Sequence, residues 1–272
     1  MKNRIFIVAL LLTSLFQVNR LKAQTTNLYS LPDSYRFDYE VDQLITGRKS
    51  AMDTNTVRFF YTKSGDYAAV SIHAKDKMKG NMFIVLTRDG NVVVMNEHKK
   101  NITIVSPRKM TSDMATLVKY IKMDSLMANM RRKTDGREFK SVKTGNVKTI
   151  GTYTTEEYTA SGKGNEKATI WCAKVDFNTQ GDYLKGVIGA NFLAMAGGGQ
   201  MHDSPLLSAL MQPKTLVTSV ETTDSTGMKR NDLQTVSIGT TSMVVPTSGY
   251  SVNNYSDKTL PEIFEAEMKK RQ

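Results

Sequence analysis

The most constraining feature of this sequence is a series of short segments in which apolar and polar residues alternate. In the first segment, Tyr35, Phe37, Tyr39 and Val41 alternate with charged residues. Successive side chains of a β-strand point to opposite faces of the sheet, so the alternation predicts a strand with one buried and one solvated face. Five more strands are predicted at close spacing, over residues 56–62, 66–74, 81–88, 91–96 and 101–106.

The connections between these segments favour antiparallel pairing of neighbours. Asp89-Gly90 separates two of the predicted strands, and this dipeptide is typical of a two-residue β-hairpin turn. Pro107 follows the last of the six strands and cannot donate a backbone hydrogen bond to a sheet. Residues 35–106 are therefore expected to form an antiparallel meander.

The second half of the chain adds further strands and three helical segments. Strands are predicted over residues 139–150, 153–160, 168–175, 216–223, 232–238 and 242–245, and helices over residues 112–133, 204–211 and 257–271. A sheet of about ten strands must curl or close rather than lie flat. The expected fold class is mostly β (α+β): a curled antiparallel sheet or half-open β barrel with helices covering the concave side.

The first residues have the order of a secretory signal peptide. Lys2 and Arg4 precede a short apolar run over residues 5–16, and Ala23 stands where a peptidase would cut. The run is too short to cross a hydrocarbon core of ~30 Å. We therefore predict a signal peptide at 1–23 and a periplasmic or secreted protein. The mature chain would have a flexible segment at 24–34, a single β domain at 35–256 and a C-terminal helix or tail at 257–272.

The charge and the cysteine content limit the partners. The chain has 272 residues, a formal net charge of +11 and one cysteine, Cys172, so it has no intramolecular disulfide framework. Its positive residues are spread over many segments, which indicates a solvated surface with some attraction to an anionic membrane surface. An exported chain rarely meets nucleic acid, so no nucleic-acid partner is expected.

No catalytic or metal-binding signature stands out. The three histidines fall in three different segments without the spacing of metal ligands: His73, His98 and His202. Cys172 follows Trp171 in a predicted strand and is interpreted as a buried structural thiol. Glu156 and Glu157 are adjacent in a strand, so they point to opposite faces and cannot flank one bond. The chain is predicted not to be an enzyme and to need no cofactor or metal.

Methionine is unusually frequent, with sixteen residues. Met123, Met127 and Met130 recur at helical spacing in the predicted helix 112–133. Three interpretations stay open: core filler, which is favoured, an adaptable apolar binding surface, and copper(I) ligation by thioethers. On the apolar interpretation, the candidate ligand-binding residues are these methionines with Ile84, Leu86 and Trp171, and the Gly- and Ala-rich residues 182–199 would form a mobile cover.

Three stretches resemble a known family. Residues 150–158, 169–171 and 245–250 are similar to an uncharacterised, domain-of-unknown-function family of exported bacterial proteins. In that family a Gly-Tyr-x-x-x-x-Tyr strand pair leads into an Ile-Trp strand, whereas here Thr152 separates Gly151 from Tyr153. The resemblance implies a fold similar to that of the periplasmic lipoprotein carriers LolA and LppX, a half-open β barrel capped by helices.

The expected function is therefore that of a periplasmic, non-enzymatic binding protein. Its ligand would be a lipid or a lipid-modified partner such as a lipoprotein, held between the curled sheet and the helical cover. The alternative is an envelope protein–protein interaction or structural module with a filled core and no ligand.

Overall fold

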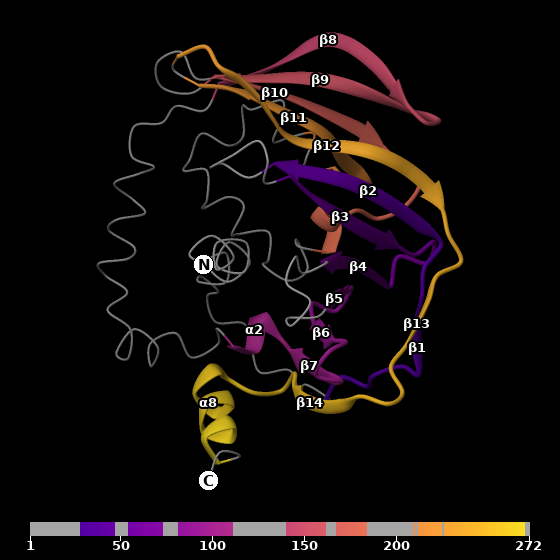
Figure 1. The fold of residues 1–272 in the computed structure, drawn as a ribbon, viewed down its shortest axis with the longest axis vertical. Coiled ribbons are helices and arrows are strands. Elements are labelled where there is room, and N and C mark those ends of the chain that lie inside the picture. Colours follow the sequence, from indigo (N-terminus) through magenta and orange to yellow (C-terminus); the bar gives the residue numbers. More distant parts are fainter. Residues whose placement is uncertain are drawn as a thin grey trace.

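The structure is a computed structural model that describes residues 28–46, 54–72, 81–110, 140–161, 167–183, 209, 212–224 and 226–269. Twelve strands of this part form one sheet (Figure 1). In their order across the sheet, the strands are β14 (Ser251–Tyr255), β7 (Asn101–Val105), β6 (Val92–Asn96), β5 (Met82–Thr87), β4 (Tyr67–Ile72), β3 (Thr54–Tyr61), β2 (Tyr39–Thr46), β12 (Lys229–Thr240), β11 (Thr215–Thr223), β10 (Lys167–Lys174), β9 (Tyr153–Ser161) and β8 (Lys140–Ile150).

The remaining described elements are short. Strands β1 (Ser34–Arg36) and β13 (Val244–Pro246) form a separate two-stranded ribbon, and the helices are α2 (Pro107–Met110) and α8 (Leu260–Lys269). None of the helices in the described ranges is long and apolar enough to cross a membrane. The predicted helix 112–133 lies outside the described residues, and of the predicted helix 204–211 only Ala209 is described.

The predicted meander is present in β2 to β7, where each strand pairs antiparallel with the next. The hairpin at Asp89-Gly90 is confirmed. Gly90 has a φ of 87°, and the Thr87 amide donates to the Asn91 carbonyl at 3.0 Å. A positive φ costs glycine little because glycine has no Cβ, which explains why this dipeptide closes the turn.

Two features of the sheet differ from the sequence prediction. The strand expected to begin at Tyr35 is interrupted, because Phe37 and Asp38 separate β1 in the ribbon from β2 in the main sheet. The Phe37 amide donates to the Met243 carbonyl and the Asp38 amide to the Tyr61 carbonyl, both at 2.9 Å, so the chain changes sheets between them. Strand β14 was not predicted, and it pairs parallel to β7.

The prediction of a large, mostly antiparallel sheet is confirmed, but the sheet does not close into a barrel. Strands β14 and β8 are its two edges, and no ladder joins them among the described strands. Figure 1 shows the sheet curving between these edges, with the β1–β13 ribbon running along its outer side. Open edges at both ends place the fold between a flat sheet and a closed barrel.

One face of the sheet is sealed by the ribbon. Phe60, Ala69, Val85, Val93 and Ile104 form a continuous row across β3 to β7, and each is at most 3% exposed. Side chains from the ribbon and its flanks pack on this row, with Phe37 ring centroids 5.5 Å from Phe60 and 5.7 Å from Phe83. This is the largest of the buried clusters in the described part of the chain.

The terminal helix begins later than predicted. The predicted helix 257–271 starts at Asp257, but α8 starts at Leu260 and Thr259 caps it: the Thr259 amide and hydroxyl donate to Glu262 Oε2 at 2.7 and 2.8 Å. A Thr followed three residues later by Glu is the capping-box arrangement, which satisfies donors that the first helical turn leaves unpaired.

Replacement of Phe37 by Ala tests the role of the ribbon. Phe37 is 2% exposed, whereas Phe264 on α8 is 62% exposed. Removal of a buried ring leaves a cavity, so Phe37→Ala should lower the free energy of unfolding by about 3–5 kcal/mol. Phe264→Ala, the matched control, should change it by less than about 0.5 kcal/mol. Urea denaturation gives both values, and equal losses would contradict the packing described here.

Candidate functional site

The candidate site is the face of β3 to β7 opposite the ribbon. Two of the predicted ligand-binding residues, Ile84 and Leu86, lie on β5 and alternate with Phe83 and Val85 of the sealed face. Strand geometry therefore directs them to the other side of the sheet. The sequence prediction that Ile84 and Leu86 share one face is consistent with the strand positions.

Strand register extends this face on both sides of Ile84. Phe59, Val70, Ile84, Val94 and Thr103 form one row across five strands. Ile84 is 9% exposed and the other four are partly exposed, in contrast to the row beneath the ribbon, which is almost fully buried. We call this row and the neighbouring Leu86, Val92 and Val105 the apolar face.

One end of the apolar face is filled by the chain itself. Leu86 packs against a buried cluster that contains Tyr61, Phe177 and Tyr183. Tyr61 and Phe177 stack with ring centroids 4.7 Å apart, and the Tyr183 hydroxyl donates to the Tyr67 carbonyl at 3.1 Å. The segment after β10 thus bounds the face near Leu86, while Ile84, Val70 and Val94 lie outside that cluster.

Trp171, the third predicted element of the site, lies on another part of the sheet, and its contribution to ligand binding stays a prediction. Trp171 lies on β10, and five strands separate β10 from β5 in the sheet. The sheet curves between these strands, and Ala173 of β10 belongs to the buried cluster against which Leu86 of β5 packs. The Lys148 ammonium stands 4.1 Å from the centre of the Trp171 ring, a cation–π contact, and burial lowers the pKa of Lys148.

The three methionines of the predicted site, Met123, Met127 and Met130, lie outside the described residues. So do His73, His202 and most of the Gly- and Ala-rich segment 182–199. The proposed contribution of the three methionines and of the segment 182–199 to the site stays a prediction.

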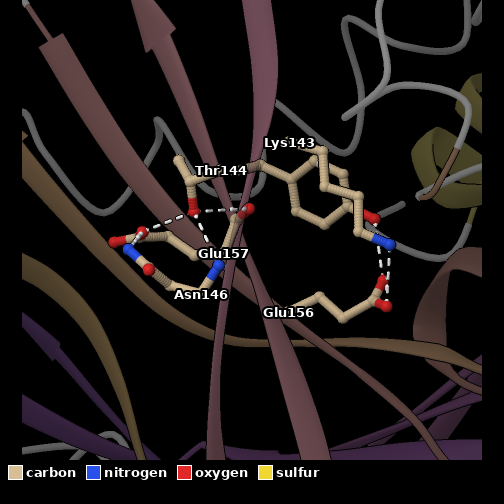
Figure 2. Close-up of polar contacts among 6 residues, drawn as sticks. Lys143, Thr144, Asn146, Glu156 and Glu157 are labelled. Atoms are coloured by element: carbon tan, nitrogen blue, oxygen red, sulfur yellow. Dashed lines mark hydrogen bonds and ion pairs between the residues drawn. The ribbon is translucent and has the colours of Figure 1, made fainter.

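The carboxylate pair Glu156–Glu157 has the arrangement that the sequence predicted. Figure 2 shows the two side chains leaving opposite sides of β9. Glu156 pairs with Lys143 at 2.8 Å, and this hydrogen bond lowers the pKa of Glu156. Glu157 Oε2 accepts from Thr144 at 2.7 Å and Asn146 at 2.5 Å. Each carboxylate is occupied by its own partners, so the pair does not form an acid–base site.

A bulge in β8 positions the Glu157 contacts. The register between β8 and β9 shifts between Lys143 and Val147, and Gly145 there has a φ of 87°. Residues 144–146 of β8 lie opposite Glu157 alone, and these two extra residues make β8 bend, while glycine permits the left-handed backbone. The bulge brings Thr144 and Asn146 to the same carboxylate (Figure 2), which indicates a structural role for this cluster.

The other titratable groups in the described ranges are also dispersed. No group of three or more His, Cys, Asp or Glu side chains there is arranged to hold a metal ion. His98 is exposed in the turn after β6. Cys172 is 5% exposed, and burial, with a smaller contribution from the Glu156 charge, raises the pKa of its thiol to about 12.

No family model matches the chain, and no curated protein matches it. The family resemblance of the sequence therefore stays a prediction.

The Cys172 thiol gives a direct test of the core beneath β9 to β11. A thiol with a pKa of about 12 holds little thiolate at pH 8.5, and thiolate is the form that reacts with iodoacetamide. Alkylation of the native protein at pH 8.5 should be at least roughly a hundredfold slower than in guanidinium, since each pKa unit changes the thiolate fraction about tenfold. Mass spectrometry measures both alkylation rates. Equal rates in the native and the denatured protein would show that the Cys172 thiol is accessible and that its pKa is not raised.

Proposed function

We propose that this chain is a non-enzymatic binding protein for a lipid or another hydrophobic ligand, including a lipid-modified protein, and that it works in the periplasm or outside the cell. The observation that supports this proposal is the unequal burial of the two faces of β3 to β7. The ribbon seals Phe60, Val85 and Ile104, whereas the apolar row through Val70 and Val94 keeps part of its surface accessible.

The apolar face fits a chain-like ligand for two reasons. Its side chains are aliphatic or aromatic in four of the five positions of the row, Phe59, Val70, Ile84 and Val94, so they offer surface but almost no directional hydrogen bonding. Covering such surface with an acyl chain is favourable by ~0.8 kcal/mol per buried methylene. A row that crosses five adjacent strands has a length of ~19 Å at the usual strand spacing, which is enough to contact much of an acyl chain.

The predicted signal peptide is consistent with an exported protein, and the predicted likeness to LolA and LppX is consistent with one that shields apolar groups from water. Without the predicted signal peptide the chain keeps a formal net charge of +7, which adds attraction to anionic lipid headgroups. An interaction or structural module without ligand is the second candidate. The filling of one end of the apolar face by Phe177 and Tyr183 favours that alternative.

Native mass spectrometry of the protein purified from a bacterial envelope, followed by organic extraction, tests the proposal. A co-purifying lipid would support it and would identify the ligand class. An apo mass that does not change on addition of a fatty acid or a lipopeptide would favour the interaction module.

A pair of isosteric substitutions tests the position of the site. Val70→Thr with Val94→Thr places two hydroxyls on the apolar face without changing its shape, and each buried hydroxyl without a partner costs roughly 1–3 kcal/mol. Binding of a fluorescent fatty acid should weaken by roughly tenfold or more.

The matched control is Val142→Thr with Val147→Thr on β8, where the two valines are 59% and 65% exposed. This double variant should bind as the parent does. Equal binding by both double variants, with folding confirmed by circular dichroism, would exclude the apolar face as the site.

A further inference from the structure

The row of the apolar face that contains Leu86 is closed at both of its ends. Its members are register partners on six neighbouring strands, β3 to β7 and β14: Tyr61, Ala68, Leu86, Val92, Val105 and Tyr255. The two residues at the β3 end and Tyr255 at the other end are at most 6% exposed, whereas the three between them are partly exposed. The accessible part of this row therefore crosses only three strands, ~10 Å at the usual strand spacing.

Phe177 closes the row at β3. Its ring packs on the rings of Tyr39 and Tyr61, register partners on β2 and β3, and both centroid distances are 4.7 Å. Phe177 is 1% exposed and belongs, with Tyr61 and Ala68, to the cluster against which Leu86 packs. A ligand that covers Leu86 therefore meets this cluster before it reaches Tyr61.

The segment that carries Phe177 is fixed at the start of β11. The Val175 amide donates to the Lys214 carbonyl at 3.0 Å, and the Thr179 hydroxyl donates to the Thr215 carbonyl at 2.9 Å. The Lys214 amide donates to the Asp182 carboxylate at 2.9 Å. All three bonds run to residues 214 and 215, outside β3 to β7, so a ligand on the apolar face does not compete for them. Phe177 is thus held over the row as a fixed stop.

The Tyr61 hydroxyl indicates that this closed end is not packed for stability alone. The hydroxyl is buried and has no hydrogen-bond partner in the described part of the chain. The Gln180 backbone lies nearby without completing a hydrogen bond. Buried polar groups are normally paired, and an unpaired one lowers stability. A contact that is kept at such a cost is expected where side chains shape a binding site.

The closed end also sets the orientation of an amphiphilic ligand. A charged head group loses its water when it is buried, which is costly without a partner. The surface next to Leu86 is formed by Ala68 and aromatic rings, so it offers no partner for a charge. The terminal methyl group of an acyl chain therefore points toward Phe177, and the head group points away from it.

We propose that Phe177 is a specificity-determining residue of the apolar face, because its ring stops the terminal methyl group of an acyl chain over Leu86. The ligand class is then an amphiphile with a medium-length acyl chain, since methylenes beyond the stop gain no cover. This inference rests on the proposed lipid-binding function and narrows its ligand.

The test is a chain-length profile, measured by isothermal titration calorimetry with the saturated fatty acids from octanoate to hexadecanoate. In the parent protein each added methylene should raise the affinity about fourfold until the chain reaches Phe177, and longer chains should gain nothing more. Phe177→Leu should move this plateau to a longer fatty acid and raise the affinity for that acid at least about fourfold. Phe264→Leu, at a position that is 62% exposed, is the control and should leave the profile unchanged.

The outcomes separate this inference from the proposed function. An unchanged plateau in folded Phe177→Leu, or an equal shift in Phe264→Leu, would overturn the role of Phe177 and leave lipid binding intact. Absence of binding of every fatty acid to the parent protein would overturn the inference together with the proposed function.

A second measurement decides if Phe177→Leu does not fold. In the parent protein with decanoate, the terminal methyl group of the ligand should give nuclear Overhauser effects to the Leu86 methyl groups and the Phe177 ring, but none to the Ala68 methyl group. A contact with Ala68 would show that the chain passes Phe177 and would contradict the stop.

Discussion

The pairing of β2 with β12 is the interaction on which the rest of the sheet depends. It joins residues 39–45 to residues 233–240 and thereby fuses the N-terminal meander with the strands β8 to β12. Gln43 lies buried at this seam, 2% exposed, and its amide donates to the Val217 carbonyl at 2.9 Å and to Thr235 Oγ1 at 3.1 Å. A buried amide whose donors are both satisfied fixes the register, because any slip would leave it unpaired.

Local patterns in the sequence explain which strands were predictable. The alternation in β2 to β7 and the Asp89-Gly90 turn involve neighbours in the chain, so the strands and their antiparallel order follow from short stretches of sequence. The β2–β12 seam and the parallel β14–β7 pair join segments that are far apart in the chain. β14, with the sequence Ser-Val-Asn-Asn-Tyr, has no regular alternation and few apolar residues, so nothing in it indicates a strand.

The same limit applies to the candidate site. Alternation alone was enough to place Ile84 and Leu86 on one face of β5, because orientation along a single strand is a local property. Trp171 was grouped with them because of its residue type, but strand order separates β10 from β5 by five strands. The packing of the β1–β13 ribbon over Phe83 was not predicted either, because no short motif encodes that crossing.

The two faces of β5 are buried to different extents and by different parts of the chain. Phe83 and Val85 are committed to the core because the ribbon covers them. Ile84 and Leu86 cannot join that core, since adjacent residues of a strand point in opposite directions. Their apolar side chains therefore have to be covered on the opposite face of the sheet, either by the chain near Phe177 or, in the proposed function, by a ligand. Substitutions of Phe83 and Val85 should lower the free energy of unfolding. Substitutions at partly exposed positions such as Val70 and Val94 should change it little and, if the proposed function holds, should weaken ligand binding. This separation is what makes the binding proposal testable without unfolding the sheet.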